Sequence, residues 1–486
     1  MSELVELFAR VFRDDPDRVV LPAAWPARAC TARQVWADAA DLAAALARAG
    51  VGAGSLVAVS SGNDVSTCAA WLACRLRDAA VMPLDRASTA AESADIMTAF
   101  GPAVTLVRLA DTDRGEVAGG LRVVPSDVEG PLQRGYPGAA VLKLTSGTSG
   151  RPKATFTTEA QALADARHII EGMGIAPDDV QIGAIPLSHS YGIGNLVLPL
   201  LMQGTALVLR NSFVPQQLAD DARLFGARVL CGVPFMFDHF VTHPLSGGWP
   251  ATLRWLISAG APLDTRTQVQ FARAFDIKIR SFYGTSETGG IAFDATDAQT
   301  TEATVGSPLP GVSVTLCRAE SDSRQGGRVH VESAAVSTGY TERGVATEEF
   351  RGAFLTEDFG RFNPGGQLVL TGRMSGFINV AGRKVQPDEV ECILRAMPGV
   401  ADALVVGVGD RDRGEQLVAC IVPEATPPTL FAVRRHCARW LAPHKVPRRL
   451  IVLDALPRTG RGKPDRGELR RLAAGQIPSA GRSDVT

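Results

Sequence analysis

The chain has 486 residues, a formal net charge of −1 at neutral pH, and 45% hydrophobic and 21% charged residues. It is too long for one ordinary hydrophobic core, so we expect more than one domain. The balanced charge argues against nucleic acid and anionic membrane surfaces as partners.

The first third of the chain alternates between helix and strand patterns. The N-terminal segment MSELVELFARVFRDDPDR is charged throughout and lacks the apolar core of a signal peptide. Thr31 and Gln34 have the spacing of a capping box before a predicted helix with apolar positions from Val35 to Leu46. A strand at 55–60, a helix at 64–76 and a strand at 80–84 follow. This alternation predicts an α/β layered domain with a largely parallel sheet.

The α/β pattern resumes after residue 155 and continues to about 295. Within it, 193–209 is the longest apolar stretch of the chain. Asn195, Pro199 and Gln203 interrupt this stretch, which is also short for a membrane span. We therefore expect a buried helix that leads into a buried strand, and no membrane span.

The pattern changes after Gly311. Short alternating strands at 312–318, 327–333 and 366–373, separated by glycine-rich turns, predict a β subdomain. We expect a large N-terminal domain over 1–373 that includes this subdomain.

A small α+β domain is predicted over 374–475. Pro387 begins a helix with apolar positions Val390, Ile393, Leu394 and Met397. Strands at 403–408 and 416–422 and a second helix at 430–441 follow. The polar tail over 476–486 is predicted to be disordered.

Two residue counts restrict the chemistry. The eight cysteines contain no CxxC pair and do not group with the seven histidines, which argues against a disulfide framework and a zinc site and favours a reducing cytoplasm. Of the 50 basic residues only six are lysines, and the other 44 (50 − 6) are arginines. A lysine within a chemical motif is therefore more informative here than in an average chain.

The segment TSGTSGRPK at 145–153 follows an apolar strand and has the composition of a phosphate-binding loop. Two glycines allow close approach of a ligand to the backbone, and hydroxyls line the turn. The Walker A pattern GxxxxGK[ST] is absent, so a P-loop kinase or GTPase is disfavoured. The alternative interpretation is an ordinary surface turn.

This segment resembles the phosphate-loop signature of the adenylate-forming superfamily, which contains acyl- and aryl-CoA ligases, the adenylation domains of peptide synthetases, and firefly-type luciferases. The resemblance extends along essentially the whole chain. It implies a large α/β domain and a small mobile α+β domain. It also implies that the phosphates of ATP bind at Thr145, Ser146, Gly147, Thr148, Ser149, Gly150 and Lys153.

The segment SFYGTSET at 281–288 resembles the second signature of the superfamily. Tyr283 would present a flat face to adenine, with Gly284 and Thr285 beside it. Ser286 would donate to the α-phosphate, and Glu287 would supply a carboxylate ligand for Mg²⁺. A solvated loop carboxylate is the alternative for Glu287.

Two further segments are expected on the nucleoside side. ISAGAP at 257–262 resembles the adenine-edge strand and loop, which implicates Gly260, Ala261 and Pro262, although plain turn residues would look the same. LTEDFG at 355–360 resembles the segment whose aspartate, here Asp358, accepts both ribose hydroxyls. Arg373 in the following TGR would supply a cation.

The C-terminal segment LPRTGRGK at 456–463 resembles the catalytic loop of the superfamily. Lys463 would place a point charge between the substrate carboxylate and the α-phosphate, two anions that must approach each other. The hinge between the two domains aligns with Ser375, where Asp or Lys is more usual, and Asn379 also departs from the common lysine. The resemblance implies that the small domain rotates about this hinge between two half-reactions.

PLSHSYG at 186–192 occupies the position of the acid-pocket entrance. His189 resembles the gate residue of acyl-CoA ligases, and Ser190, Tyr191 and Gly192 follow it. Phe235 could belong to an apolar wall or to the core, and Gly260 and Gly284 would also border the pocket. An aspartate that would pair with an α-ammonium is not seen in this segment, and Ser190 stands where relatives that bind 2-hydroxybenzoates have Asn.

These patterns predict the ATP-dependent activation of an aromatic or medium-length carboxylic acid, not an α-amino acid, followed by transfer to the thiol of CoA. A separate acyl carrier protein with its phosphopantetheine, or an amine, remains an alternative acceptor. A nucleotide-binding pseudoenzyme would be expected to lack Lys463 or Glu287, and both are present. A luciferase-like oxidase would be recognised by oxygen consumption.

Overall fold

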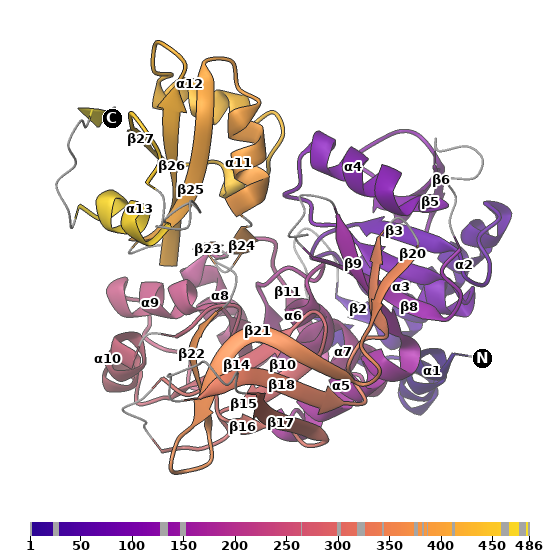
Figure 1. The fold of residues 1–486 in the computed structure, drawn as a ribbon. Helices are drawn as coiled ribbons and strands as arrows, with labels where there is room; N and C mark the ends of the chain where they lie inside the picture. The colour runs from indigo at the N-terminus through magenta and orange to yellow at the C-terminus, as the bar shows by residue number, and fades with distance from the viewer. Residues whose placement is uncertain are drawn as a thin grey trace. The chain divides into compact units, whose positions relative to one another are not determined.

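A computed structural model describes residues 2–22, 29–126, 135–145, 152–263, 265–298, 303–317, 326–342, 345–373, 378–381, 383–385, 387–410, 414–457, 466–475 and 483–484. The chain divides into two compact units. The first contains Met1–Arg86, Met97–Thr145 and Lys153–Met374, and the second consists mainly of Ser375–Thr486 and also takes in Ala87–Ile96. The predicted fold class, a large α/β domain with a β subdomain and a small α+β domain, is confirmed (Figure 1).

The first unit contains a nine-stranded mixed sheet with the order β20-β19-β9-β8-β4-β3-β5-β7-β6. Its four central strands, β8, β4, β3 and β5, are parallel, and the outer ones are antiparallel. The strands are β3 (Leu56–Ser60), β4 (Ala80–Pro83), β5 (Val104–Arg108), β6 (Glu116–Ala118), β7 (Leu121–Pro125), β8 (Ala139–Thr145), β9 (Lys153–Thr158), β19 (Gly339–Glu342) and β20 (Val345–Glu349).

A second, seven-stranded sheet has the order β11-β10-β12-β13-β14-β15-β16. It is parallel from β11 to β14, and β15 and β16 are antiparallel. The strands are β10 (Val180–Gly183), β11 (Ala206–Leu209), β12 (Val229–Gly232), β13 (Trp255–Ser258), β14 (Ile279–Thr285), β15 (Gly289–Phe293) and β16 (Ser307–Pro308).

Both faces of the seven-stranded sheet are buried, which explains why its parallel strands are apolar without alternation. Leu207 and Ile257 pack into the large central core, whereas Leu230 and Leu256 pack on the opposite face. That opposite face is covered by α8 (Pro215–Phe225), α9 (Pro234–Thr242) and α10 (Thr265–Phe275).

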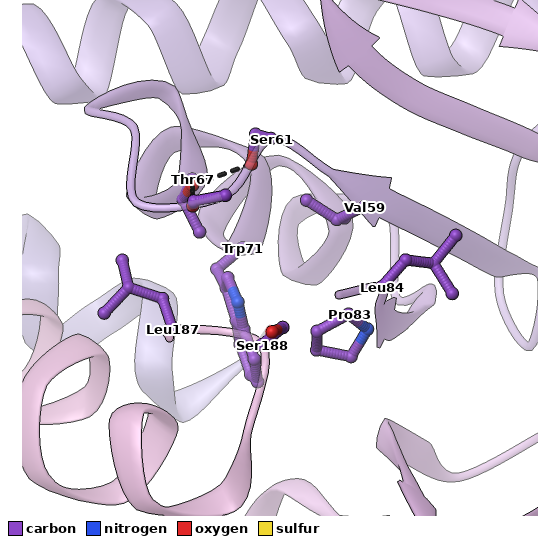
Figure 2. Close-up of a pocket in the computed structure, with 9 residues that line it drawn as sticks. Val59, Ser61, Thr67, Trp71, Pro83, Leu84, Leu187 and Ser188 are labelled. Atoms are coloured by element: carbon purple, nitrogen blue, oxygen red, sulfur yellow. Dashed lines mark hydrogen bonds between the residues drawn. The ribbon is translucent and has the colours of Figure 1, made fainter. Parts of the chain in front are cut away.

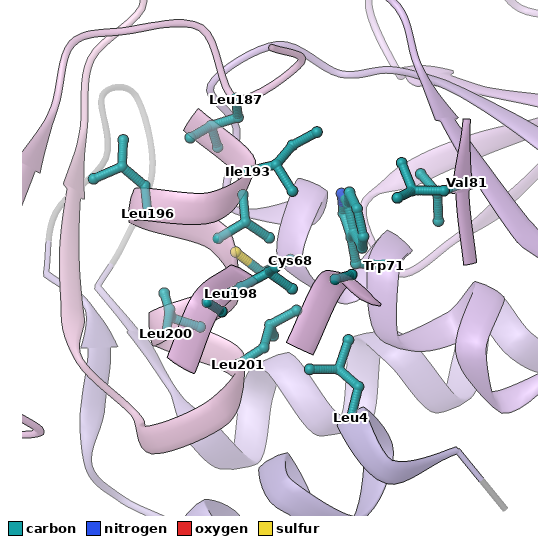
Figure 3. Close-up of a cluster of buried hydrophobic side chains, with 14 of the residues drawn as sticks. Leu4, Cys68, Trp71, Val81, Leu187, Ile193, Leu196, Leu198, Leu200 and Leu201 are labelled. Atoms are coloured by element: carbon teal, nitrogen blue, oxygen red, sulfur yellow. The ribbon is translucent and has the colours of Figure 1, made fainter. Parts of the chain in front are cut away.

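The central core is filled by side chains from helices that are far apart in the sequence. Leu4 of α1 (Glu3–Asp14), Trp71 of α3 (Ser66–Leu76) and Leu201 lie in one buried cluster (Figure 3). α5 (Glu159–Met173) contacts strands of both sheets, namely β8 and β9 of one and β15 of the other. The remaining elements of this unit are α2 (Ala32–Arg48) and the paired strands β1 (Val19–Leu21) and β2 (Cys30–Thr31), whereas α4 (Ala90–Phe100) is divided between the two units after Ile96.

The predicted capping box is confirmed at the start of α2. The Thr31 side chain accepts the Gln34 N–H, and the Gln34 side chain accepts the Thr31 N–H. The same device, which the sequence analysis did not identify, begins α5 at Thr158 and Gln161. These pairs satisfy N–H groups that a helix end leaves without partners.

The apolar stretch at 193–209 forms buried helix and then buried strand, as predicted. It contains a π-helical turn, η1 (Ile193–Val197), followed by α7 (Leu198–Gln203) and β11. A π-turn widens the helix and is often found at functional sites, and this one directly follows α6 (Ser190–Gly192). Within the described residues, no helix is long and apolar enough to cross a membrane.

The β subdomain is a four-stranded antiparallel sheet with the order β17-β18-β21-β22. Three of its strands were predicted, but β21, which contains Asp358, was not. The strands are β17 (Val312–Cys317), β18 (Gly327–Ser333), β21 (Ala353–Phe362) and β22 (Leu368–Arg373).

The second unit has its own sheet and its own core. The core is formed by apolar side chains that include Val390 and Leu394, as the helical spacing predicted, with Val433 and Cys437 of the next helix. The elements are α11 (Pro387–Arg395), α12 (Leu430–Cys437), α13 (Arg466–Ala473), the 3₁₀ turn η2 (Pro443–Lys445), and the strands β23 (Ile378–Val380), β24 (Arg383–Val385), β25 (Val400–Asp410), β26 (Gly414–Pro423), β27 (Arg449–Val452) and β28 (Ser483–Asp484).

A buried carboxylate joins three elements of the second unit. Glu391 of α11 is 2% exposed and accepts the Val405 N–H over 2.8 Å. Arg466 at the start of α13 donates to both Glu391 oxygens, over 2.5 and 3.1 Å. A bidentate arrangement of this kind is among the stronger side-chain interactions in proteins.

We predict that Glu391→Ala destabilises the second unit by about 3 kcal/mol, because Arg466 and the Val405 N–H lose their acceptor. Hydrogen–deuterium exchange of the full chain should show faster exchange in β25 and β26. Glu424→Ala, which removes an exposed carboxylate from the same unit, should change stability by less than about 0.5 kcal/mol. If the amides of β25 and β26 exchanged at the same rate in the two variants, the role given to Glu391 would be wrong.

Candidate active site

The segment that resembles a phosphate loop joins the two strands of a hairpin. Thr145 ends β8, Lys153 begins β9, and the two residues are paired across the ladder. The Thr145 hydroxyl donates to the Lys153 carbonyl over 3.5 Å. Pairing thus brings the ends of the loop together. Outside the described residues lie the loop positions Ser146, Gly147, Thr148, Ser149 and Gly150.

The second signature forms the end of β14 and a tight turn into β15. A Cβ atom on Gly284 would lie 2.6 Å from the Gly289 carbonyl oxygen, so only glycine fits there. The Thr285 hydroxyl accepts the Thr288 N–H over 3.2 Å and closes the turn. The half-buried Glu287 lies within this turn.

Three other segments contact the same turn. The Thr155 hydroxyl of β9 donates to the Ser286 carbonyl over 3.5 Å, and the Ser337 N–H donates to the Glu287 carbonyl over 2.8 Å. The hydroxyls of Ser190 and Ser286 are 3.4 Å apart. The structure therefore brings the phosphate hairpin, the acid-pocket segment and the second signature to one place.

Tyr283 and Asp358 are 75 positions apart in the chain and meet through their side chains. The Tyr283 hydroxyl donates to Asp358 Oδ2 over 2.7 Å. Asp358 pairs with Arg373 across the β21–β22 ladder, although the Arg373 side chain lies outside the described part of the chain. The residues expected on the adenine and ribose sides of a nucleotide are thus adjacent.

The adenine-edge residues lie at the level of Tyr283. Ser258 at the end of β13 is paired with Ser281 of the parallel strand β14, so Gly260, just after β13, and Tyr283, within β14, are each two positions beyond this pair. Gly260 has φ +82°, a conformation that glycine adopts without strain. Ala261, which is half-buried, and Pro262, which is exposed, follow it.

One residue close to the predicted metal ligand was missed by the sequence analysis. The Tyr340 hydroxyl donates to Glu287 Oε1 over 2.7 Å, and Lys153 Nζ lies 5.2 Å from the centre of the Tyr340 ring. The chain contains only four tyrosines. That scarcity is the signal that could have drawn attention to Tyr340.

His189 has a carboxylate partner that the sequence analysis also missed. Its Nε2 lies 3.3 Å from Asp85 Oδ2, and the His189 side chain is half exposed. Asp85 follows β4 and His189 directly precedes α6, so two segments far apart in the chain meet here. The loop before His189 is held by Asn63, whose side chain accepts the Leu187 N–H and donates to the Ile185 carbonyl, each over 2.9 Å.

Tyr191 and Phe235 each contact another aromatic ring, but they pack against clusters on opposite faces of the seven-stranded sheet. Tyr191 packs against Phe282, and its hydroxyl donates to the Ile257 carbonyl over 3.1 Å. Burial raises the pKa of Tyr191 well above its usual value, so the hydroxyl remains a donor. Phe235 is half-buried and packs edge-on against Phe213.

Gly192 packs against the backbone of its own loop. A Cβ atom there would lie 2.3 Å from the Pro186 carbonyl oxygen, so a larger residue would displace the segment that carries His189.

A small cavity adjoins this segment (Figure 2). Its volume of about 10 Å³ corresponds to about one water molecule, so it cannot hold the acid. The cavity is lined by Val59, Ser61, Gly62, Thr67, Trp71, Pro83, Leu84, Leu187 and Ser188.

Two buried ionisable side chains, Lys143 and Asp165, lie near the β14–β15 turn, and each charge acts on the other. Asp165 of α5 accepts the Gly290 N–H over 2.8 Å. Burial raises the pKa of Asp165, and the nearby charge of Lys143 opposes this shift. Burial likewise lowers the pKa of Lys143, against the charges of Asp165 and Glu287. Each ion is therefore stabilised by the other in a site that disfavours both.

The catalytic lysine and the hinge of the sequence analysis, Lys463 and Ser375, lie outside the described residues, so their roles remain predictions. Arg466, three positions after Lys463, is fixed to Glu391 as described above.

Family models account for most of the chain. The model of the AMP-binding enzyme family matches residues 8–341, and that of the AMP-binding enzyme C-terminal domain matches residues 389–463. The chain belongs to the AMP-binding enzyme family. The resemblance to the adenylate-forming superfamily is thereby confirmed.

Individual relatives agree with this assignment. A protein of Mycobacterium tuberculosis named as a probable 2-succinylbenzoate–CoA ligase is 32% identical over 69% of this chain and 85% of its own length. A feruloyl-CoA synthase of Amycolatopsis sp. is 28% identical over 89% of this chain and 91% of its own. The structure of the amide bond synthetase McbA from Marinactinospora thermotolerans superimposes with a TM-score of 0.83 at 26% identity, covering 97% of this chain and 99% of its own.

The residues present fit a magnesium ion held jointly with phosphates. Among the described residues, no group of three or more His, Cys, Asp or Glu side chains could hold a metal by itself. Mg²⁺ commonly uses one or two carboxylates together with substrate phosphates and water. Glu287, with one oxygen bonded to Tyr340, is a carboxylate of this kind.

We predict that Lys143→Met and Asp165→Asn are each destabilising, because one buried charge then lacks the opposite charge that offsets its burial. The double variant should recover most of the loss. The pKa of Asp165 is already raised in the folded protein, and removing Lys143 raises it further. The loss in Lys143→Met should therefore be largest at neutral pH and decrease as the pH falls and Asp165 binds a proton. Denaturant unfolding at several pH values measures these stability losses. If the losses of the two single variants simply add in the double variant, Lys143 and Asp165 do not stabilise each other.

Proposed function

We propose that the chain uses ATP to activate a carboxylic acid as an acyl-adenylate and then transfers the acyl group to the thiol of CoA. The hydrogen bond between Tyr283 and Asp358 carries this proposal. It joins an aromatic face suited to adenine with a carboxylate suited to the two ribose hydroxyls. The family assignment supports the same chemistry.

In the first half-reaction, a carboxylate oxygen of the acid attacks the α-phosphorus of ATP and pyrophosphate leaves. The hairpin ends Thr145 and Lys153 would bind the phosphates, and Ser286 would donate to the α-phosphate. Glu287 would hold Mg²⁺, which neutralises phosphate charge when bound. Lys463 would offset the repulsion between the two approaching anions.

In the second half-reaction, the thiol of CoA attacks the acyl carbon and AMP leaves with its electron pair. We propose that the small domain, 374–475, turns about Ser375 between the two steps, which removes Lys463 from the site. Ribose contacts at Asp358 and Arg373 would hold AMP in both steps. ATP and CoA as substrates are consistent with a cytoplasmic location, which we propose as well.

We propose an aromatic acid as the substrate, with a medium-length acyl acid as the alternative. The contact between the ring of Tyr191, in the predicted pocket segment, and the ring of Phe282 supports this choice. His189, held by Asp85, would lie at the pocket entrance. Two relatives are named for ligases of aromatic acids, 2-succinylbenzoate and ferulate.

Amide formation is the second candidate, because the chain is 26% identical to an amide bond synthetase over nearly its whole length. In that case an amine, not a thiol, attacks the acyl-adenylate. A separate carrier protein would be a third type of acceptor.

The deciding experiment measures pyrophosphate release across a panel of aromatic, aliphatic and amino acids, with CoA, with simple amines or with neither. Thioester formation with CoA supports the main proposal. Pyrophosphate release with amide but no thioester would support the second candidate, and no release with any acid would exclude an adenylating enzyme.

We predict that Lys463→Ala slows adenylation about 100-fold or more while acyl transfer from supplied acyl-adenylate to CoA is spared. Arg461→Ala, which removes a cation from the same segment, is the matched control and should affect neither step selectively. Separate assays of the two half-reactions measure this. Equal loss of both in Lys463→Ala would contradict the two-conformation scheme.

A further inference from the structure

The four tyrosine hydroxyls of the chain all donate hydrogen bonds, but to different kinds of acceptor. Tyr136 and Tyr191 donate to backbone carbonyls, those of Phe100 and Ile257. Tyr283 and Tyr340 instead donate to carboxylates, Asp358 and Glu287. A hydrogen bond to an ionised acceptor is stronger and fixes its geometry more closely. Tyr283 contributes to the nucleoside side, whereas the predicted signatures give no role to Tyr340.

The backbone places Tyr340 between two elements: the β8–β9 hairpin, which carries the predicted phosphate loop, and the β14–β15 turn, which carries Glu287. Tyr340 lies in β19, where it is paired with Thr155 of β9, two positions after Lys153. Just before β19, the Ser337 N–H donates to the Glu287 carbonyl over 2.8 Å. The segment from Ser337 to Tyr340 is therefore bonded both to β9, which begins at Lys153, and to the turn that carries Glu287.

The side chain of Tyr340 makes the same two connections. Its hydroxyl donates to Glu287 Oε1 over 2.7 Å, and its ring face lies 5.2 Å from Lys153 Nζ, within the range of a cation–π interaction. The ring packs edge-on against Phe350 and Phe354, which fixes its plane. A rigid ring thus holds an anion at its hydroxyl end and a cation over its face.

We propose that Tyr340 is a positioning residue for the Mg²⁺–ATP site. It orients the Glu287 carboxylate through the hydrogen bond to Oε1, and its ring supports Lys153 at the start of β9. Hydrogen-bonded partners of metal ligands commonly act in this way. The inference rests on the proposed role of Glu287 as a ligand of Mg²⁺.

The test measures ATP binding by isothermal titration calorimetry on the full chain, without acid substrate, in Mg²⁺ or in EDTA. The ratio of the two affinities reports how strongly the metal and the nucleotide assist each other. Tyr340→Phe keeps the ring and removes only the hydroxyl. It should reduce this ratio about tenfold, while binding in EDTA stays within about twofold of the wild type.

Two further variants separate the contributions. Tyr340→Leu also removes the ring, so ATP binding in EDTA should weaken as well, because Lys153 loses its support. Tyr136→Phe is the matched control, since it removes a hydroxyl bond of 2.8 Å to the Phe100 carbonyl at a buried position. It should leave the Mg²⁺ ratio unchanged, and its thermal unfolding calibrates the structural cost of a lost tyrosine hydroxyl.

An unchanged ratio in Tyr340→Phe, with a normal ratio in the wild type, would overturn this inference and leave the proposed function intact. Equal reductions in Tyr340→Phe and Tyr136→Phe would also overturn it, because the effect would then be structural. Wild-type protein whose ATP binding is indifferent to Mg²⁺ would overturn both this inference and the metal-binding role of Glu287.

Discussion

The geometry of the site depends on a close contact between a helix and a turn that only glycine permits. Gly289 has φ +70°, and a Cβ atom there would lie 2.2 Å from Asp165 Oδ1. The next residue, Gly290, donates its N–H to the same oxygen. A side chain at Gly289 would displace the Asp165 carboxylate from the turn. Because Ser286 and Glu287 precede this contact directly, their positions depend on it.

The turn lies where the seven-stranded and nine-stranded sheets of the first unit come together. It connects β14 and β15 of the seven-stranded sheet. Two residues of the nine-stranded sheet region bond to it: Thr155 in β9, and Ser337, which lies just before β19. Hydroxyl and N–H donors from one sheet thus hold the backbone carbonyls of the other. The site is a product of this junction, which explains why its residues come from segments so far apart in the chain.

The rarity of lysine proved informative in some places and not in others. Lys143 and Lys153 both lie beside the turn. Lys278, however, forms a buried ion pair with Asp294 over 2.7 Å, and Lys445 pairs with Glu389 over 2.8 Å. A compact ammonium suits buried ion pairs as well as phosphate contacts, so residue scarcity alone does not distinguish structural from chemical roles.

The sequence by itself determined the fold class, the capping box at Thr31, and the short motifs that include Tyr283 and Asp358, because these depend on periodicity or on neighbouring residues. Tertiary structure alone decided which side chains meet. The bonds of Tyr340 with Glu287 and of Asp85 with His189 join segments 53 and about 100 positions apart, and no local pattern encodes them. Strand β21 was missed for a related reason: its polar residues are accommodated by pairing with β18 and β22, which only the assembled sheet provides.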